Sequence, residues 1–245
     1  MMPSRRLLLR AVAFSLASAF GTRGFAQDRY ATAREDLLRE IENDMRATAR
    51  DTGYSALSSA VRRALATVAR ERFVPPQLAA FSYENRPLPI GEGQTISQPF
   101  IVALMTELLQ PKPDHVVLEV GTGSGYQAAV LAECVAKVYS IEIVAPLAQR
   151  ARAALDAAGY RNVETRIGDG YQGWPEAAPF DGIVVTAAPD HVPPRLIEQL
   201  KPRGRLVIPV GPHRATQELL VIEAGSDGRT ITRRTIAVRF VPLTR

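Results

Sequence analysis

Residues 116–125 read VVLEVGTGSG and decide the fold, because the apolar run Val116–Val120 passes directly into a glycine-rich turn. Glycine is needed where the backbone turns sharply or comes close to a ligand, since a Cβ would collide there. A helical pattern follows, so the stretch predicts a strand, a tight loop and a helix. By itself such a turn indicates a ligand only weakly, because many of these turns merely pack a helix on a sheet.

Similar β-rich runs recur along the chain and alternate with alanine-rich helical stretches. The strand-like runs are 138–143, 163–167, 182–186 and 205–210, and the helical stretches are 126–136 and 145–158. This alternation needs crossover connections and predicts an α/β fold with a doubly wound, mainly parallel Rossmann-like sheet. Two further strand-like runs, 218–223 and 230–241, are separated by a turn at 225–228 and predict an antiparallel C-terminal edge.

The chain ahead of this sheet is predicted to form a mainly helical arm. Residues 31–49 and 61–70 carry apolar side chains at helical spacing, and so do residues 100–109. The segment 82–99 is rich in proline and glycine and is interpreted as a loop. We therefore expect one domain, residues 27–245, with a helical N-terminal arm.

Residues 1–26 have the organisation of an export signal. Arg5 and Arg6 precede a short apolar run, which cannot span the ~30 Å hydrocarbon core of a membrane as a permanent helix. The paired arginines resemble a twin-arginine signal peptide. We expect a periplasmic or otherwise exported protein without a stable membrane anchor, cleaved after Ala26 or Ala19. The alternative is an upstream start codon that adds unused basic sequence, and the protein would then be cytoplasmic.

Composition and charge exclude several classes of function. The 245 residues are 46% hydrophobic and 22% charged, which is ordinary for a soluble globular protein. A single cysteine, Cys134, excludes a disulfide framework, and the three histidines lack metal-ligand spacing, so no metal site is expected. The net charge is +5, but residues 1–26 contain four arginines and no acidic residue. The rest is nearly neutral, and nucleic acid is not an expected partner.

The residues around the glycine loop indicate an adenosine ligand without phosphate. The spacing is GxGxG, unlike the GxGxxG of dinucleotide sites, and no lysine stands in the P-loop position. Glu142 ends the next strand, where a carboxylate can accept hydrogen bonds from both ribose hydroxyls. Asp169, after the third strand, suits an adenine amino group, and Glu119 faces either the loop or the ligand's amino group. S-adenosylmethionine fits this pattern, with the predicted contacts Glu119, Gly121, Thr122, Gly123, Ser124, Gly125, Glu142, Asp169 and Gly170.

With these features in place, the chain resembles the protein-L-isoaspartate O-methyltransferase family over nearly all of residues 30–245. The glycine loop is common to many methyltransferases, whereas the other stretches are more specific. Arg203 replaces a glycine that is usual in the family, and a leader precedes the family's normal start. The resemblance rests on 70–75 (RERFVP), 91–99 (GEGQTISQP), 117–126 (VLEVGTGSGY), 181–189 (DGIVVTAAP) and 200–211 (LKPRGRLVIPVG).

The resemblance implies a repair enzyme that methylates the free α-carboxylate of L-isoaspartyl residues in damaged proteins and peptides. We expect a monomer, although the sequence itself does not fix the oligomeric state. The resemblance also implies Ser97 as the catalytic residue, through a hydrogen bond to substrate and without a nucleophilic role. Spacing alone favours a different role, in which Thr95 and Ser97 only shape their loop. The remaining implied contacts are Gln94, Thr95 and Ile96 over the cofactor, and Arg86, Pro87, Leu88, Thr186, Ala187 and Ala188 along the substrate.

Two alternatives stay open at this point. One is a methyltransferase that acts on another carboxylate or on a small molecule, and the other is a non-catalytic module that binds isoaspartyl peptides. Among the remaining residues, Trp174 is expected beside the adenine end of the ligand. Cys134 is expected to be a small buried hydrophobic residue.

Overall fold

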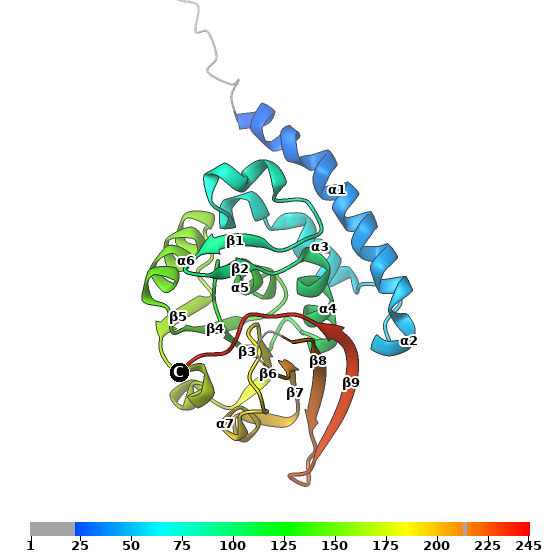
Figure 1. Cartoon of the computed structure of the whole chain (residues 1–245), viewed down its shortest axis with the longest axis vertical. Coiled ribbons are helices and arrows are strands. Elements are labelled where there is room, and N and C mark those ends of the chain that lie inside the picture. Colours follow the sequence, from blue (N-terminus) through cyan, green and yellow to red (C-terminus); the bar gives the residue numbers. More distant parts are fainter. Residues whose placement is uncertain (1–22, 213–214) are drawn as a thin grey trace, which may run out of the picture.

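Seven strands form one sheet in the order β5-β4-β3-β6-β7-β8-β9 (Figure 1). The computed structural model describes residues 23–212 and 215–245. Five strands are parallel, namely β3 (Val116–Val120), β4 (Lys137–Glu142), β5 (Val163–Ile167), β6 (Phe180–Val185) and β7 (Leu200–Val210). The antiparallel edge consists of β8 (Gln217–Ala224) and β9 (Thr230–Val238). The sheet predicted from the sequence is confirmed.

The strand order reverses at β3, and this reversal positions the site. The chain runs outward from β3 to β4 and β5, then returns to form β6 on the other side of β3. Val120 at the end of β3 pairs with Ile141 of β4 and with Val185 of β6. The loops that follow β3 and β6 therefore emerge side by side, at the kind of switch point where open α/β sheets bind ligands.

Two hydrophobic clusters cover the two faces of the sheet, because successive strand residues point to opposite sides. On β6, Val184 belongs to the first cluster, and Ile183 and Val185 to the second. The second face is covered by α7 (Pro194–Glu198) and the 3₁₀ turns η3 (Gly170–Gln172) and η4 (Pro175–Ala177). The first cluster includes residues of α1 (Arg23–Ala47), α3 (Ser59–Thr67), α4 (Pro99–Leu109), α5 (Tyr126–Ala132) and α6 (Ala145–Ala158).

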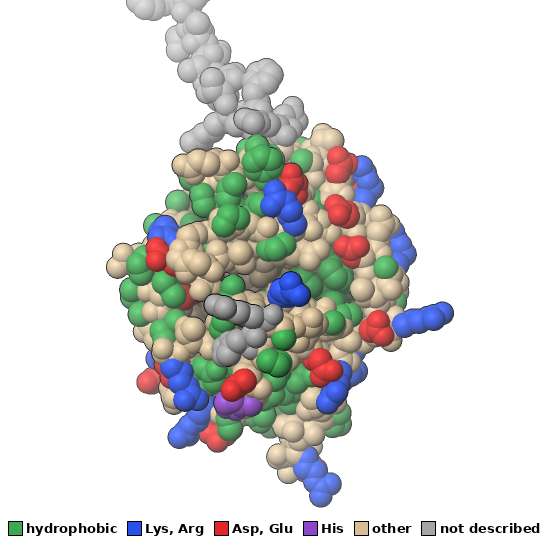
Figure 2. Space-filling view, in the orientation of Figure 1, with side chains coloured by type: hydrophobic (Ala, Val, Ile, Leu, Met, Phe, Trp, Pro, Cys, Tyr) green, Lys and Arg blue, Asp and Glu red, His purple; other side chains and the backbone are tan. Residues whose placement is uncertain are grey.

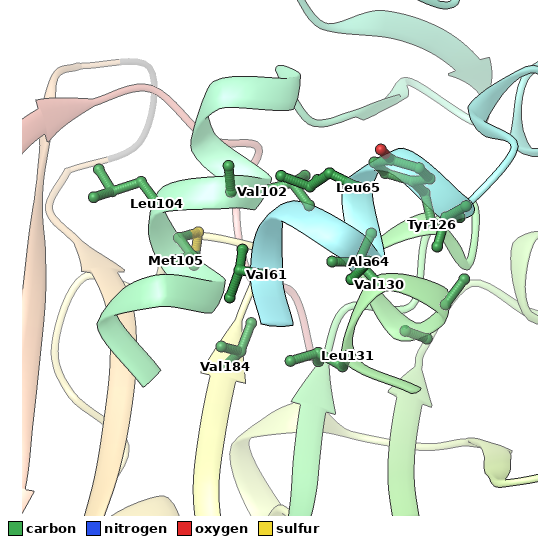
Figure 3. Close-up of a cluster of buried hydrophobic side chains, with 14 of the residues drawn as sticks. Val61, Ala64, Leu65, Val102, Leu104, Met105, Tyr126, Val130, Leu131 and Val184 are labelled. Atoms are coloured by element: carbon green, nitrogen blue, oxygen red, sulfur yellow. The ribbon is translucent and has the colours of Figure 1, made fainter. Parts of the chain in front are cut away.

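Helix α4 is apolar almost all round because it lies between layers. It contacts α1, α3 and α5 as well as β6 and β7, and a helix without a polar face is typical of such buried positions. Figure 3 shows Val102 and Met105 of α4 on the side of α3 and α5, and Leu104 on the opposite side of α4. The position of α4 matters for the site, because the segment that carries Ser97 leads directly into it.

The structure corrects the predicted loop at 82–99, which contains a β-hairpin. Strands β1 (Leu88–Gly91) and β2 (Gln94–Ile96) pair antiparallel. Glu92 and Gly93 at the turn have φ of 53° and 70°, the positive values that two-residue hairpin turns require. With only seven strand residues, one of them a proline, the hairpin gives a weak sequence signal.

Several element boundaries also differ from the prediction. α1 begins at Arg23 and is followed by the short α2 (Ala49–Thr52), so the predicted cleavage after Ala26 falls inside a helix. The helix predicted to reach residue 70 ends at Thr67, and two 3₁₀ turns follow it, η1 (Arg70–Phe73) and η2 (Pro76–Phe81). Most of the predicted leader, residues 1–22, lies outside the described part of the chain.

On the face shown in Figure 2, acidic and basic side chains are interspersed, and hydrophobic side chains gather nearer the centre. Within residues 23–212 and 215–245, no helix is long and apolar enough to span a membrane. In the same residues, no group of three or more His, Cys, Asp or Glu side chains is arranged to hold a metal ion.

Candidate active site

A cavity lies at the carboxyl ends of β3, β4 and β6, at the edge where open α/β sheets bind their ligands. We refer to it as the central cavity. Its walls come from the hairpin segment, the glycine loop, the ends of the strands and the C-terminal segment. Of the twelve predicted cofactor contacts, the cavity is lined by Gln94, Thr95, Ile96, Glu119, Gly121, Thr122, Gly123, Ser124, Glu142 and Gly170.

The glycine loop is held by the strands on both sides. The N–H groups of Gly121 and Thr122 donate to the carbonyl oxygen of Ile141, at 2.8 and 3.1 Å. The hydroxyl of Thr186, after β6, donates to the carbonyl oxygen of Gly121 at 2.6 Å. Gly121 has a φ of 98°, and its close packing explains why this position has no side chain.

Glu142 lies at the end of β4, as predicted, and both of its carboxylate oxygens bind the adjoining backbone. Oε2 accepts the N–H of Gly123 at 2.8 Å, and Oε1 accepts the N–H of Val144 at 2.9 Å. Each carboxylate oxygen can accept a second hydrogen bond. The predicted contact with ribose hydroxyls therefore remains compatible with this geometry.

Glu119 is completely buried beneath the glycine loop. The hydroxyl of Ser140 donates to its Oε2, and Ser140 in turn is 2.6 Å from the hydroxyl oxygen of Thr122. Its Oε1 has no partner among the described residues. Burial raises the pKa of this carboxyl to about 8, with a smaller contribution from the nearby charge of Glu142.

A second unpartnered acceptor lines the same cavity. Gln127 donates through Nε2 to the hydroxyl of Thr106 at 2.9 Å, but its buried Oε1 has no partner among the described residues. Buried acceptors without partners are uncommon in folded proteins. Glu119 and Gln127 together suit a ligand that brings hydrogen-bond donors and positive charge, and the ammonium group of S-adenosylmethionine has both properties.

Three residues predicted near the ligand lie outside the central cavity. The side chain of Asp169 caps η3, where Oδ1 accepts the N–H of Tyr171 at 2.9 Å. Gly125 caps the N-terminus of α5, and a Cβ at this position would lie only 3.2 Å from Leu155 of α6. Trp174 belongs to the second hydrophobic cluster, with the guanidinium carbon of Arg166 4.3 Å from its ring centroid.

A second, more open depression meets the central cavity, and we refer to it as the side groove. The two share Thr95, Ser97, Thr186, Val241 and Pro242. Ser97 and Thr186 therefore stand at the junction between the central cavity and the side groove. From there the side groove continues along Pro87, Gln98, Ile101, Thr216, Ala237, Val238, Arg239 and Phe240.

The structure places only some of the predicted substrate contacts at the two depressions. Pro87 and Thr186 line the side groove, and Thr186 and Ala187 line the central cavity. Arg86 is half exposed and pairs with Glu84, outside both depressions.

The side chain of Leu88 and the backbone of Ala188 make other contacts and are not available to a substrate. Leu88 is completely buried in the first cluster, because alternate residues of β1 face inward. The N–H of Ala188 donates to Val241 O at 2.8 Å, and its carbonyl oxygen accepts the N–H of Leu243 at 2.9 Å. Ala188 was expected along the substrate, but its backbone groups are already used by the C-terminal segment.

Sequence reasoning missed Arg70, and for the C-terminal stretch around Thr244 the family resemblance gave only a weak indication of a place near the cofactor. The segment 241–244 forms one wall of the central cavity, and Figure 1 shows this red segment crossing the edge of the sheet. Arg70 is fully buried and donates through Nη2 to the carbonyl oxygen of Ser97 at 2.8 Å. Arginine usually lies at the surface, so only its place in RERFVP marked it in the sequence.

Comparisons with known proteins agree with this geometry. Residues 40–245 match the family model "Protein-L-isoaspartate(D-aspartate) O-methyltransferase (PCMT)". The chain is 56% identical over 227 residues to "Protein-L-isoaspartate O-methyltransferase 2" of Syntrophobacter fumaroxidans, covering 93% of this chain and 92% of the relative. It is 51% identical over 241 residues to "Protein-L-isoaspartate O-methyltransferase 1" of Cupriavidus necator, covering 98% and 92%.

Two solved structures share the fold. One is a protein-L-isoaspartate O-methyltransferase with a TM-score of 0.72 and 28% identity, matched over 86% of this chain and 66% of that one. The other is a putative protein-L-isoaspartate O-methyltransferase from Plasmodium falciparum in complex with S-adenosyl-L-homocysteine. It has a TM-score of 0.71 and 24% identity, over 88% of this chain and 98% of that one.

Proposed function

The chain belongs to the protein-L-isoaspartate(D-aspartate) O-methyltransferase family, and we propose that Ser97 and the side groove position the substrate for that reaction. The enzyme transfers a methyl group from S-adenosylmethionine to the free α-carboxylate of L-isoaspartyl residues in damaged proteins and peptides. The observation that carries the proposal is the junction of the central cavity and the side groove at Ser97 and Thr186. A peptide in the groove would reach a small-molecule donor in the cavity at this point.

The reaction needs alignment more than acid–base chemistry. A carboxyl group with an ordinary pKa near ~4 is already ionised at neutral pH, so no general base is required to create the nucleophile. Bound S-adenosylmethionine supplies a methyl group activated by its sulfonium. The task of the protein is to hold one carboxylate oxygen roughly 3–3.5 Å from the methyl carbon, in line with the sulfur.

In this proposal Ser97 orients the substrate carboxylate. Its hydroxyl donates a hydrogen bond to one carboxylate oxygen and leaves the other free to attack. Opposite charges cancel as the methyl group is transferred, so very tight ground-state ion pairing would oppose the rate. A neutral hydroxyl is therefore a suitable donor at this position.

The residues proposed to hold the methyl donor are polar residues that line the central cavity. The free oxygens of Glu119 and Gln127 are available to its ammonium group. Glu142 is available to its ribose, and the hairpin segment Gln94–Ile96 covers it from the groove side. Asp169 would contact only the adenine edge of the donor, because its carboxylate also caps η3.

The decisive experiment compares a synthetic isoaspartyl peptide with its normal aspartyl twin, using radiolabelled methyl donor. We expect base-labile methyl ester on the isoaspartyl peptide alone. Equal labelling of both peptides would favour a broader carboxylate methyltransferase. Binding of the isoaspartyl peptide without labelling, by a protein that holds its donor, would favour a non-catalytic module and contradict the assignment of Ser97.

We also propose that the protein is exported to the periplasm through its twin-arginine-like leader. The match to the C. necator relative covers 98% of this chain, and residues 27–245 alone cannot account for that share. A counterpart of the leader in a relative argues against an accidental upstream start. Fractionation of cells that express the full chain, beside an Arg5→Lys, Arg6→Lys variant, tests this proposal. Equal cytosolic retention of both would contradict it.

We further propose that the enzyme acts as a monomer. Light scattering of the purified protein at assay concentration should give the mass of a single chain. A stable dimer whose dissociation abolishes activity would contradict this proposal.

A further inference from the structure

Arg70 is the only buried cation in the described part of the chain, residues 23–212 and 215–245. It begins η1 and is completely shielded from solvent. None of the described carboxylates forms an ion pair with it. A buried charge without an acidic partner costs folding free energy. Such a residue needs an explanation beyond packing.

The guanidinium of Arg70 binds two backbone segments in different directions. Nε donates to the carbonyl oxygen of Ser82, and Nη2 donates to the carbonyl oxygen of Ser97, both at 2.8 Å. Nη1 has no partner among the described residues. Desolvation lowers the pKa of Arg70 to about 10, so the side chain stays charged at neutral pH.

The same guanidinium contacts the donor half of the site. Its carbon lies 4.7 Å from the ring centroid of Tyr126, the first residue of α5 after the glycine loop. Tyr126 lines the central cavity together with Ser97. One side chain therefore touches both the segment that carries Ser97 and the helix that follows the glycine loop.

A second anchor holds the other end of the Ser97 segment. The side-chain oxygen of Asn85 accepts the N–H of Phe100 at 3.0 Å, and its Nδ2 donates to Asp44 of α1 at 2.8 Å. Asn85 fixes the start of α4, whereas Arg70 fixes the peptide group of Ser97 itself. Without Arg70, the residues between Ile96 and α4 would lose their side-chain anchor on the cavity side.

We propose that Arg70 is a positioning residue, which fixes the Ser97 peptide relative to the glycine loop so that the Ser97 hydroxyl meets the substrate carboxylate in the reactive orientation. This inference rests on the role proposed above for Ser97. An arginine suits the position because its rigid planar fork can bind two carbonyl groups at once and lie against an aromatic ring. A lysine has a single nitrogen and cannot reproduce that arrangement.

The test compares Arg70→Lys, which keeps the charge, with the wild-type enzyme. We expect kcat for the isoaspartyl peptide to fall at least tenfold, while the Kd for S-adenosylhomocysteine changes less than twofold. Hydrogen–deuterium exchange of the segment 94–98 should become faster, because its anchor is lost. A purely structural role would lower thermal stability without this separation of kcat from ligand affinity.

Arg233→Lys is the matched control. Arg233 also donates to a backbone carbonyl across elements, from Nη1 to Thr52 O at 2.6 Å, and it lines neither the central cavity nor the side groove. We expect its kcat to stay within twofold of wild type, with unchanged exchange in 94–98. A loss of kcat in Arg233→Lys equal to that in Arg70→Lys would overturn the assignment.

Several outcomes would contradict the inference. These are wild-type kcat/KM in Arg70→Lys, unchanged exchange in 94–98, or a loss of donor affinity that matches the loss of kcat. If Arg70→Lys and Arg70→Gln both lack a cooperative thermal transition, Arg70 is a core residue and the proposal is wrong. If the wild type itself fails to methylate the isoaspartyl peptide, the proposed function fails, and the exchange experiment still decides whether Arg70 anchors Ser97.

Discussion

The hydroxyl of Thr186 donates to the carbonyl oxygen of Gly121 at 2.6 Å, and a Cβ on Gly121 would lie 2.6 Å from that same hydroxyl oxygen. The loops after β3 and β6 therefore form one unit at the switch point of the sheet. Their close contact requires that residue 121 has no side chain.

The first prediction concerns Gly121→Ala. The substitution combines a left-handed φ, which costs an L-residue about 1–2 kcal/mol, with a collision against Thr186. We expect the Kd for S-adenosylhomocysteine, measured by calorimetry, to rise more than tenfold. Gly159→Ala is the control, because Gly159 has a φ of 88° but open space around its Cβ position. It should lose similar backbone stability and keep its ligand affinity, and a tenfold weaker Kd in the control would contradict the prediction.

The second prediction concerns Ser97→Ala. Removing one well-placed hydrogen-bond donor from a reacting centre commonly costs 10²–10³-fold in rate. Because the reaction here neutralises charge, we expect the lower end, about 10- to 100-fold in kcat/KM for the isoaspartyl peptide. The Kd for S-adenosylhomocysteine and the exchange of segment 94–98 should not change, which separates this variant from Arg70→Lys. Full activity in Ser97→Ala would exclude the hydroxyl from catalysis.

The third prediction concerns protonation of Glu119 when the donor binds. Below its pKa of about 8 the carboxyl holds a proton in the free enzyme, whereas a bound ammonium group favours the carboxylate. Binding of S-adenosylhomocysteine at pH 7 should therefore release close to one proton. Calorimetry in buffers of different ionisation enthalpy measures this release, and Glu119→Gln should abolish it.

The same shift affects stability with a definite sign. The raised pKa means that unfolded Glu119 loses its proton near pH 4.5, while the folded protein keeps it until about pH 8. The free energy of unfolding contributed by this group therefore falls as pH rises from about 4.5 to about 8. Denaturant titrations of wild type and Glu119→Gln should converge at low pH and diverge towards pH 8, with the variant more stable there. The opposite divergence would contradict the assignment.

The fourth prediction concerns Leu88 and Arg86, which we expect to affect protein stability or nothing at all, and not the binding of substrate. Leu88 is completely buried, so Leu88→Ala should lower the free energy of unfolding by about 2–5 kcal/mol. Its KM for the isoaspartyl peptide should stay within twofold, because the side chain lines neither depression. Arg86→Ala, at a half-exposed position, should change stability by about 0.5 kcal/mol or less. A selective rise in KM for either variant would contradict this prediction and support the substrate contact that the resemblance implied.

Local sequence signals were sufficient to predict the parallel half of the sheet. β3, β5 and α6 begin and end at the predicted residues, since each is a strongly patterned segment flanked by turn residues. The glycine loop and Glu142 were placed correctly at the edge of the sheet, because the carboxyl ends of parallel strands share one edge.

The remaining features depend on contacts between distant parts of the chain. Arg70 looks like a surface residue in the sequence, and only the fold brings Ser82 and Ser97 to its guanidinium. Asp169 stands beside Gly170 as expected, yet its carboxylate turns to the nearest free N–H, that of Tyr171. Ala188 was expected along the substrate, but its backbone N–H and carbonyl groups are hydrogen-bonded to the C-terminal segment.

That C-terminal wall gives the protein an order of assembly. Val241, Pro242, Leu243 and Thr244 line the central cavity, and the ribosome makes them after every other residue that lines it. A nascent chain can build its sheet from the first strand onward, but its pocket lacks one wall until residues 241–244 have been made. A chain that stops before Val241 should therefore bind the methyl donor more weakly than one that includes this wall.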